Sequence, residues 1–299
     1  METAAPSTRS GRPMWASYGL LIGGVAAASV SAILIRYASG APALAISFWR
    51  CLVGAAVLAP FARAGIGRMK GGGYMLPAVA GAFLAIHFAT WISSLSYTTV
   101  ASSILLVSTT PIFVAMAAWL LSKERLSPLG WSGIFLALAG TALVSGGDLG
   151  GSSFFGNMLA LIGGATAAGY VMAGAKARRE LGILEYAVVT YLAAAVLLLP
   201  VCLATGTQLG GYPVATWWAI AGLIVGPQLL GHTVINLVLS DIDPTTVSVV
   251  IMAEPIVTIA LAFMLLNEVP SLLVLPGGAA ILAGIYLVST TSRSEPVPE

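Results

Sequence analysis

Four ionisable side chains lie deep inside long apolar stretches of the sequence: Arg50, His87, His232 and Glu254. A carboxyl group can bind a cation, a proton or a substrate ammonium group, imidazoles donate or accept hydrogen bonds, and a guanidinium fork matches a carboxylate. A charge at the centre of a bilayer costs about 2.5–3.5 kcal/mol, so such residues usually face the interior of a helix bundle. These positions are therefore the first candidates for binding a small charged molecule.

Glu254 stands directly before Pro255, and Thr110 stands directly before Pro111. A proline inside a helix removes an amide donor and frees a carbonyl one turn back, so we expect helix kinks at Pro111 and Pro255. A carboxyl group beside a kink suits a cation, a proton or a substrate ammonium group. The structural alternative is a protonated Glu254 that ties two helices together. Thr110 offers polarity at the matching position but no charge.

His87 and His232 each begin a pair at i, i+4, with Trp91 and Asn236 respectively. Side chains at this spacing share a helix face, so the two pairs could line one pathway. The alternative, given equal weight, is that both histidines are core residues whose hydrogen bonds are made within the bundle. Two histidines without a nearby Cys or carboxylate do not make a metal site.

Arg50 has no charged counterpart elsewhere in the chain, since the matching position holds Thr190. Its guanidinium could hold a substrate carboxylate, or it could pair with carbonyls at a helix C-terminus and lock the fold. We favour the structural role.

The rest of the site should be a wall of aromatic and small polar residues that discriminates only weakly between substrates. The full predicted lining is His87, Trp91, Ser94, Thr110, Tyr170, Gln228, His232, Asn236 and Glu254.

The elements that position these residues must be membrane spans. The chain has 299 residues, of which 58% are apolar and 8% are charged, whereas soluble domains carry about 25% charged residues. The net charge of +2 is too small to indicate a basic surface for nucleic acid binding. Cys51 and Cys202 have no disulfide or metal-ligand spacing. We expect an all-α membrane protein in a lipid bilayer, without cofactors.

Ten stretches are long enough to cross a bilayer, which takes about 20 apolar residues. The predicted spans are 16–35, 42–62, 75–95, 99–121, 128–146, 156–175, 185–204, 215–239, 245–266 and 270–290. The connections are short, and no phosphate-binding loop of the form G-x-x-x-x-G-K-[ST] occurs, which disfavours a pump driven by its own ATP hydrolysis.

The loop charges predict the orientation. With ten spans, eleven of the thirteen Lys and Arg residues fall on the side of both termini, and only Arg36 falls on the other. They are Arg9, Arg12, Arg63, Arg68, Lys70, Lys123, Arg125, Lys176, Arg178, Arg179 and Arg293. Positive residues concentrate on the cytoplasmic side, so both termini should be cytoplasmic.

The chain also repeats itself. Residues 111–145 align without gaps on residues 255–289, with 14 of 35 positions identical. The matches include Pro111 with Pro255, Glu124 with Glu268, Gly133 with Gly277, Gly140 with Gly284, and the Leu-Val-Ser runs that end at Ser145 and Ser289. Five spans in each half place the second half in the opposite orientation. We therefore expect two inverted five-helix repeats, an arrangement typical of secondary transporters.

Several motifs resemble the EamA-type repeat of the drug/metabolite transporter superfamily. They are Thr109-Thr110-Pro111-Ile112-Phe113 with Glu124, Glu254-Pro255-Ile256 with Glu268, and Phe48-Trp49-Arg50. Within that superfamily the sequence is most similar to bacterial aromatic amino acid exporters. The resemblance implies ten helices around a central cavity and export of small metabolites across the bacterial inner membrane. The corresponding organisation is an N-terminal tail (1–15), two repeats (16–146 and 156–290) and a C-terminal tail (291–299).

The function predicted on these grounds is export of amino acids, aromatic ones and a broader range, by a secondary active transporter. An exporter of drugs or other small metabolites is the alternative, and a channel is a third reading. An intramembrane aspartyl protease would need two Asp within spans, but Asp148, Asp241 and Asp243 all lie in connections. A serine hydrolase could use Ser93 or Ser94 near His87, but no glycine-bounded nucleophile motif surrounds them. We therefore expect no enzyme. The sequence alone does not set the oligomeric state.

Overall fold

The computed structural model describes residues 11–69, 71–98, 100–123, 125–144, 153–266 and 272–291, and these residues form helices without strands. Glu124, Ser145, Asp148 and Glu268, together with Arg9, Lys70 and Arg293, lie outside the described residues. Within the described part, nine helical segments are long and apolar enough to cross a membrane. Helix α7 (Pro128–Val144) is a shorter apolar helix, and the end of its expected span, 145–146, is not described.

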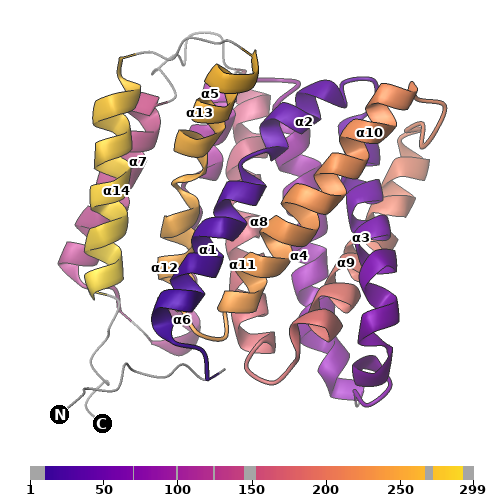
Figure 1. The fold of residues 1–299 in the computed structure, drawn as a ribbon, viewed down its shortest axis with the longest axis horizontal. Coiled ribbons are helices and arrows are strands. Elements are labelled where there is room, and N and C mark those ends of the chain that lie inside the picture. The colour runs from indigo at the N-terminus through magenta and orange to yellow at the C-terminus, as the bar shows by residue number, and fades with distance from the viewer. Residues whose placement is uncertain are drawn as a thin grey trace.

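Five of the spanning segments are single helices that connect the two faces of the bundle (Figure 1). They are α3 (Ala43–Ile66), α4 (Met75–Ser94), α8 (Phe154–Ala177), α9 (Ile183–Ala204) and α14 (Val274–Thr291). A single 3-10 turn, η1 (Gly71–Tyr74), precedes α4. Helices α3 and α9 continue through Pro60 and Pro200, each in the last two turns.

The other four spanning segments are interrupted. Helices α1 (Met14–Ala28) and α2 (Ser31–Tyr37) form the first, α5 (Val100–Val107) and α6 (Thr110–Ser122) the second, and α12 (Pro244–Ile251) and α13 (Glu254–Leu266) the third. The fourth runs through α10 (Val214–Leu223), a π-helical segment η2 (Ile224–His232) and α11 (Thr233–Val238). Two interruptions lie directly before Pro111 and Pro255. The break between α1 and α2 has no proline, and the expectation of a continuous span over 16–35 did not include it.

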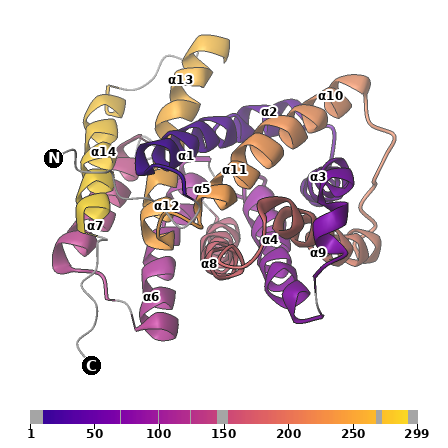
Figure 2. The ribbon, with the colours of Figure 1, turned by 60° about the horizontal axis from the view of Figure 1, so that its bottom comes forward.

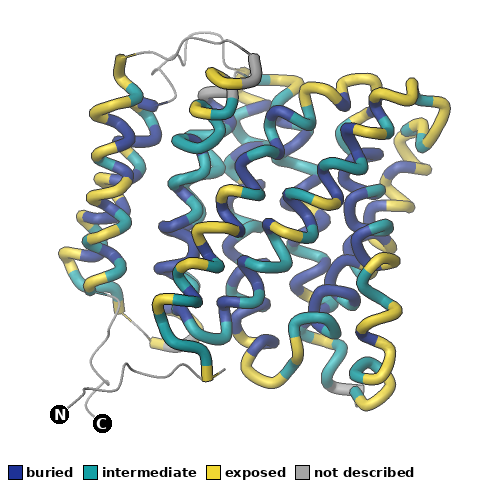
Figure 3. Tube along the Cα trace, in the orientation of Figure 1, coloured by how far each residue is buried: buried dark blue, intermediate teal, exposed yellow. Residues whose placement is uncertain are grey.

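Helix α7 pairs with α14 beside the main bundle (Figures 1 and 2). In the main bundle α4 packs on α8 and α9, α3 packs on α9, and α1 packs on η2 and α11. The first described helix begins, and the last ends, on the same face of the bundle, called here the terminal face (Figure 1). Large apolar residues such as Leu121, Trp218 and Leu275 are exposed, and exposed positions recur along the helices of the bundle (Figure 3). Apolar surfaces of this extent suit hydrocarbon rather than water.

Candidate functional site

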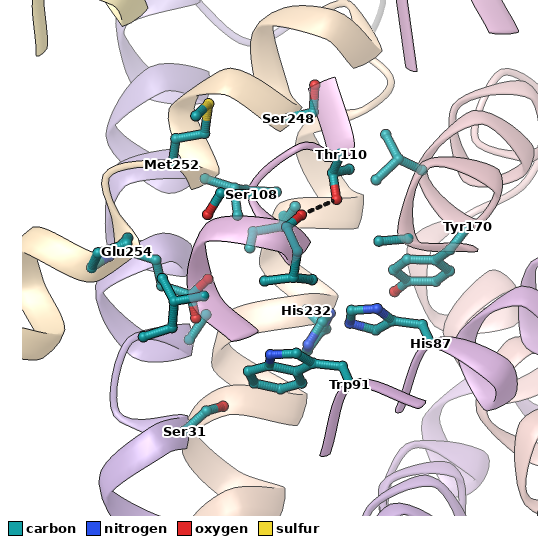
Figure 4. A pocket seen from close by; sticks show the side chains of 18 of the residues that line it. Ser31, His87, Trp91, Ser108, Thr110, Tyr170, His232, Ser248, Met252 and Glu254 are labelled. Atoms are coloured by element: carbon teal, nitrogen blue, oxygen red, sulfur yellow. Dashed lines mark hydrogen bonds between the residues drawn. The ribbon is translucent and has the colours of Figure 1, made fainter. Parts of the chain in front are cut away.

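The interrupted segments and helices α4 and α8 surround an internal cavity of about 140 Å³. By the same measure one water needs about 10–15 Å³, so the cavity can hold a small molecule. Its polar or aromatic lining consists of Ser31, His87, Trp91, Ser108, Thr110, Tyr170, His232, Asn236, Ser248, Glu254 and Thr258. Glu254 and Tyr170 enter from opposite sides (Figure 4).

Seven of the predicted lining residues come together at this cavity: His87, Trp91, Thr110, Tyr170, His232, Asn236 and Glu254. Pro111 and Pro255 line it as well. Ser94 and Gln228 do not line it. Ser94 Oγ is buried and bonds to the carbonyl of Trp91 (2.6 Å) and to Ser103 Oγ (2.7 Å). The cavity is also lined by four residues that were not predicted, Ser31, Ser108, Ser248 and Thr258, because a small polar side chain carries no distinguishing signal in an apolar span.

Two threonine hydroxyls hydrogen-bond to backbone carbonyls at or beside the helix interruptions. Thr110 Oγ1 donates to the carbonyls of Val107 (2.7 Å) and Gly164 (3.1 Å), which joins the α5–α6 break to α8. Thr258 Oγ1 donates to the carbonyl of Ser29 (2.9 Å) at the α1–α2 break. Irregular backbone at membrane depth persists only where protein groups or a cavity satisfy it. The breaks therefore belong to the construction of the cavity.

An aromatic wall forms one side of the cavity. The rings of His87 and Trp91 are stacked, with centroids 5.7 Å apart and planes at 5°. His87 Nδ1 lies 2.9 Å from the carbonyl of Gly163, and because a carbonyl only accepts, Nδ1 carries the hydrogen. His232 packs edge-on against Phe88, with centroids 5.3 Å apart. Within the described residues, Trp91 Nε1 is buried without a hydrogen-bond partner, so it can donate to a bound molecule.

Asn236 supplies a polar group at the floor of the cavity. Its amide nitrogen donates to the hydroxyl of Tyr170 and to the carbonyl of His232. Its Oδ1 is buried and has no partner among the described residues. A buried acceptor of this kind, together with the Glu254 carboxyl group, suits a ligand that donates hydrogen bonds.

Arg50 lies outside the cavity lining, behind Phe88. Its guanidinium carbon is 4.3 Å from the centroid of the Phe88 ring, a cation–π contact. The side chain is fully buried, and none of its three nitrogens has a hydrogen-bond partner in the described part of the chain. The pairing with helix C-terminal carbonyls, one of the two roles considered for Arg50, is therefore not seen among the described residues.

A hydrogen-bonded cluster lies at the terminal face, next to Asn236 of the cavity lining. Arg12 pairs with Asp241 (Nη2 to Oδ2, 2.6 Å), and Ser17 Oγ donates to the same carboxylate oxygen (2.8 Å). Arg178 Nε donates to the carbonyl of Asn236 (3.2 Å), and both arginines donate to the carbonyl of Leu237. Burial first, and the neighbouring Arg12 second, lower the pKa of Arg178.

Asp243 caps the helix that follows this cluster. Its Oδ1 accepts from the amide of Thr246 (2.8 Å) at the start of α12, which satisfies one of the free amides there. Burial raises the pKa of this carboxyl group, and the hydrogen bonds with Thr246 lower it in part.

A bundle of apolar helices, with interrupted segments around a cavity that carries a few polar groups, defines a membrane protein of transporter type. Comparison with known proteins gives the family. The EamA-like transporter family model matches twice, over residues 15–146 and 154–290, and the chain belongs to this family. The two matches together cover both halves of the chain.

Two relatives carry only general descriptions. An uncharacterized transporter of Archaeoglobus fulgidus is 28% identical over 255 residues, covering 82% of this chain and 86% of the relative. The uncharacterized transporter YdfC of Bacillus subtilis is 24% identical over 207 residues, covering 68% and 67%. A crystal structure described only as that of a protein has the same fold, with a TM-score of 0.78 and 20% identity over 94% of this chain and 99% of the other. The chain is therefore a transporter and not an enzyme.

Proposed function

We propose that the protein exports amino acids, aromatic ones and a broader range, as a secondary active transporter that binds them in the central cavity. The observation that carries the proposal is the composition of the lining: a carboxyl group, an amide oxygen without a partner among the described residues, and an aromatic wall. Glu254 and Asn236 Oδ1 suit an ammonium group, and the stacked rings of His87 and Trp91 suit a flat apolar side chain. An exporter of drugs or other small metabolites is the alternative, since such amines also fit these groups.

The second element of the proposal is an architecture of ten spans in two inverted repeats, with the repeats at 16–146 and 156–290. The pairing of α7 with α14 supports it. Gly133 lies against Gly284, and Gly140 lies against Gly277, so the two helices run antiparallel. Gly133 matches Gly277 in the repeat, and Gly140 matches Gly284. Each contact is therefore the repeat image of the other, as expected for an axis lying in the membrane plane.

The orientation follows from the positive residues of the terminal face. Arg12, Arg178 and Arg179 lie there, beside the cluster around Asp241. We propose that this face is cytoplasmic and that the protein lies in the bacterial inner membrane. A cysteine reporter at position 3 or 296 should then react from the cytoplasm, and one at Ser152 from the opposite side.

Alternating access requires the cavity to open to each face in turn. The Arg12–Asp241 pair and the hydrogen bonds that Arg178 donates to the carbonyls of Asn236 and Leu237 hold the end of α11 against the start of α1 and the end of α8. We infer that this cluster is part of the cytoplasmic closure and must separate before substrate can enter.

Purified protein in liposomes tests the proposal. Labelled phenylalanine should enter with saturable kinetics, and unlabelled phenylalanine inside should accelerate the exchange. An imposed proton or voltage gradient identifies the coupling. Flux that does not saturate and shows no counterflow would indicate a channel instead. Transport of hydrophobic amines without transport of amino acids would favour the drug exporter.

A further inference from the structure

Arg50 is a buried cation without a hydrogen-bonded counter-ion among the described residues. Its exposure is 0%, and Nε, Nη1 and Nη2 all lack partners there. The guanidinium lies over the face of the Phe88 ring, and its charge also interacts with Glu254, which lines the cavity. A buried charge is costly unless hydrogen bonds and an opposite charge compensate it. No described carboxylate lies at contact distance, so the guanidinium can bind an anion from outside the chain.

Gln228 belongs to the same buried region. It lies in the π-helical segment η2, and π-helical turns occur often at functional sites. A Cβ atom on Gly54 would stand 3.2 Å from Cγ of Gln228, and Gly54 follows Arg50 by one turn of α3. Both amide atoms of Gln228 are buried without partners in the described structure. The interface of α3 and η2 therefore holds the Arg50 guanidinium and, one helix turn further along α3, the Gln228 amide, both without partners among the described residues.

Phe88 stands between this interface and the cavity. One contact of its ring is with Arg50, at 4.3 Å, and another is with His232, whose ring is 5.3 Å away and lines the cavity. Tyr170 packs edge-on against the same histidine. The Phe88 ring therefore separates the guanidinium from His232 in the cavity wall, and a substrate carboxylate reaches the guanidinium only if this ring moves.

We propose that Arg50 and Gln228 form a carboxylate subsite behind Phe88, and that this subsite makes the transporter select molecules that carry a carboxylate. The inference rests on the proposed function and deepens it. The guanidinium fork binds both oxygens of a carboxylate, and the Gln228 amide adds a third donor. Glu254 and Asn236 Oδ1 bind the ammonium group of the same molecule. The substrate class is then the zwitterionic amino acids rather than the amines that lack the carboxylate.

Phenylalanine and phenethylamine test the proposal because they differ only by the carboxylate. Their equilibrium binding is measured on the purified full chain, in the wild type and in two variants. Gln228→Glu supplies an internal carboxylate for Arg50, and Arg50→Lys keeps the charge but removes the fork. Gln208→Glu, at an exposed position, is the matched control.

The wild type should bind phenylalanine roughly tenfold or more tighter than phenethylamine, as for hydrogen bonds to a charged group. Gln228→Glu should bring that ratio close to one and raise the melting temperature. Arg50→Lys should reduce the ratio several-fold, and the control should leave it unchanged. If Arg50 had a purely structural role, its substitution would not change the ratio of phenylalanine affinity to phenethylamine affinity.

An unchanged ratio in both variants would overturn the subsite while leaving the amino acid exporter in place. A lower melting temperature for Gln228→Glu would also contradict it, because the new carboxylate would then not face the guanidinium. Equal or tighter binding of phenethylamine by the wild type, or binding of neither compound, would overturn the proposed function and the subsite together.

Discussion

Gly140 and Gly277 bring two helices into backbone contact: a Cβ atom on Gly277 would stand 2.8 Å from the carbonyl oxygen of Gly140, and one on Gly140 would stand 2.6 Å from that of Gly277. Real Cβ atoms essentially never approach other heavy atoms this closely. Small residues at such crossings let membrane helices approach and pack by van der Waals contact. The α7–α14 pair therefore depends on these glycines.

Gly277→Ala should destabilise the protein by about 1–3 kcal/mol, since the added methyl group meets backbone that cannot rotate away. Gly278→Ala is the matched control, because its nearest heavy atom would be the end of Ile256 at 3.8 Å. Thermal unfolding in detergent measures both. Equal melting temperatures for the two variants would show that the crossing is not tightly packed.

Asp241→Asn should loosen the terminal face. The substitution removes the charge that pairs with Arg12, and the carboxylate it replaces is fully buried. We expect a cysteine placed at Val238, which is buried at the end of α11, to react faster with an impermeant thiol reagent in the Asp241→Asn background. Glu180→Gln, an exposed acid on the same face, should not change the rate. If Asp241→Asn leaves the thiol equally protected, the cluster does not contribute to closure.

Trp91→Ala should weaken the binding of large substrates more than the binding of small ones. The indole is stacked on His87 in the cavity wall, and each methylene-sized contact in an apolar pocket contributes about 1–3 kcal/mol. The KM for tryptophan or phenylalanine should therefore rise more than the KM for alanine. Trp218→Ala, on the outward face, is the control. A uniform change in KM for all substrates would show that Trp91 does not recognise the substrate side chain.

Glu254→Gln should reduce transport roughly tenfold or more while the folded protein remains in the membrane, because Gln keeps the shape and cannot carry the charge. The measurement is initial uptake rate at several pH values, with Glu180→Gln as the control. Unchanged affinity and rate at every pH would make Glu254 a structural residue.

Much of this arrangement could be predicted from the sequence because hydropathy and proline act locally. Nine of the ten predicted stretches correspond to spanning segments among the described residues, and the tenth, 128–146, corresponds to the shorter helix α7. The interruptions before Pro111 and Pro255 follow from the missing amide hydrogens. The α1–α2 break could not be foreseen, because Thr258, far along the chain, bonds to the carbonyl of Ser29.

The positions of Gln228, Ser94 and Arg50 relative to the cavity depend on which face of a helix meets its neighbours. These helices are apolar on all sides, so their sequences do not distinguish a face toward lipid from a face toward protein. Gln228 lies toward α3 and Ser94 toward Ser103, where other polar groups or small residues leave room. Which side of each helix faces protein is therefore determined by how the helices pack in the bundle.

The most direct test of the account is competition for labelled phenylalanine uptake into liposomes by a series of unlabelled amino acids and their decarboxylated amines. A lining of few polar groups and a weakly discriminating wall predicts that many amino acids compete with modest affinity, the aromatic ones best, and that the matching amines compete poorly. Competition by a single amino acid alone, or equal competition by the amines, would contradict the assignment as a broad amino acid exporter.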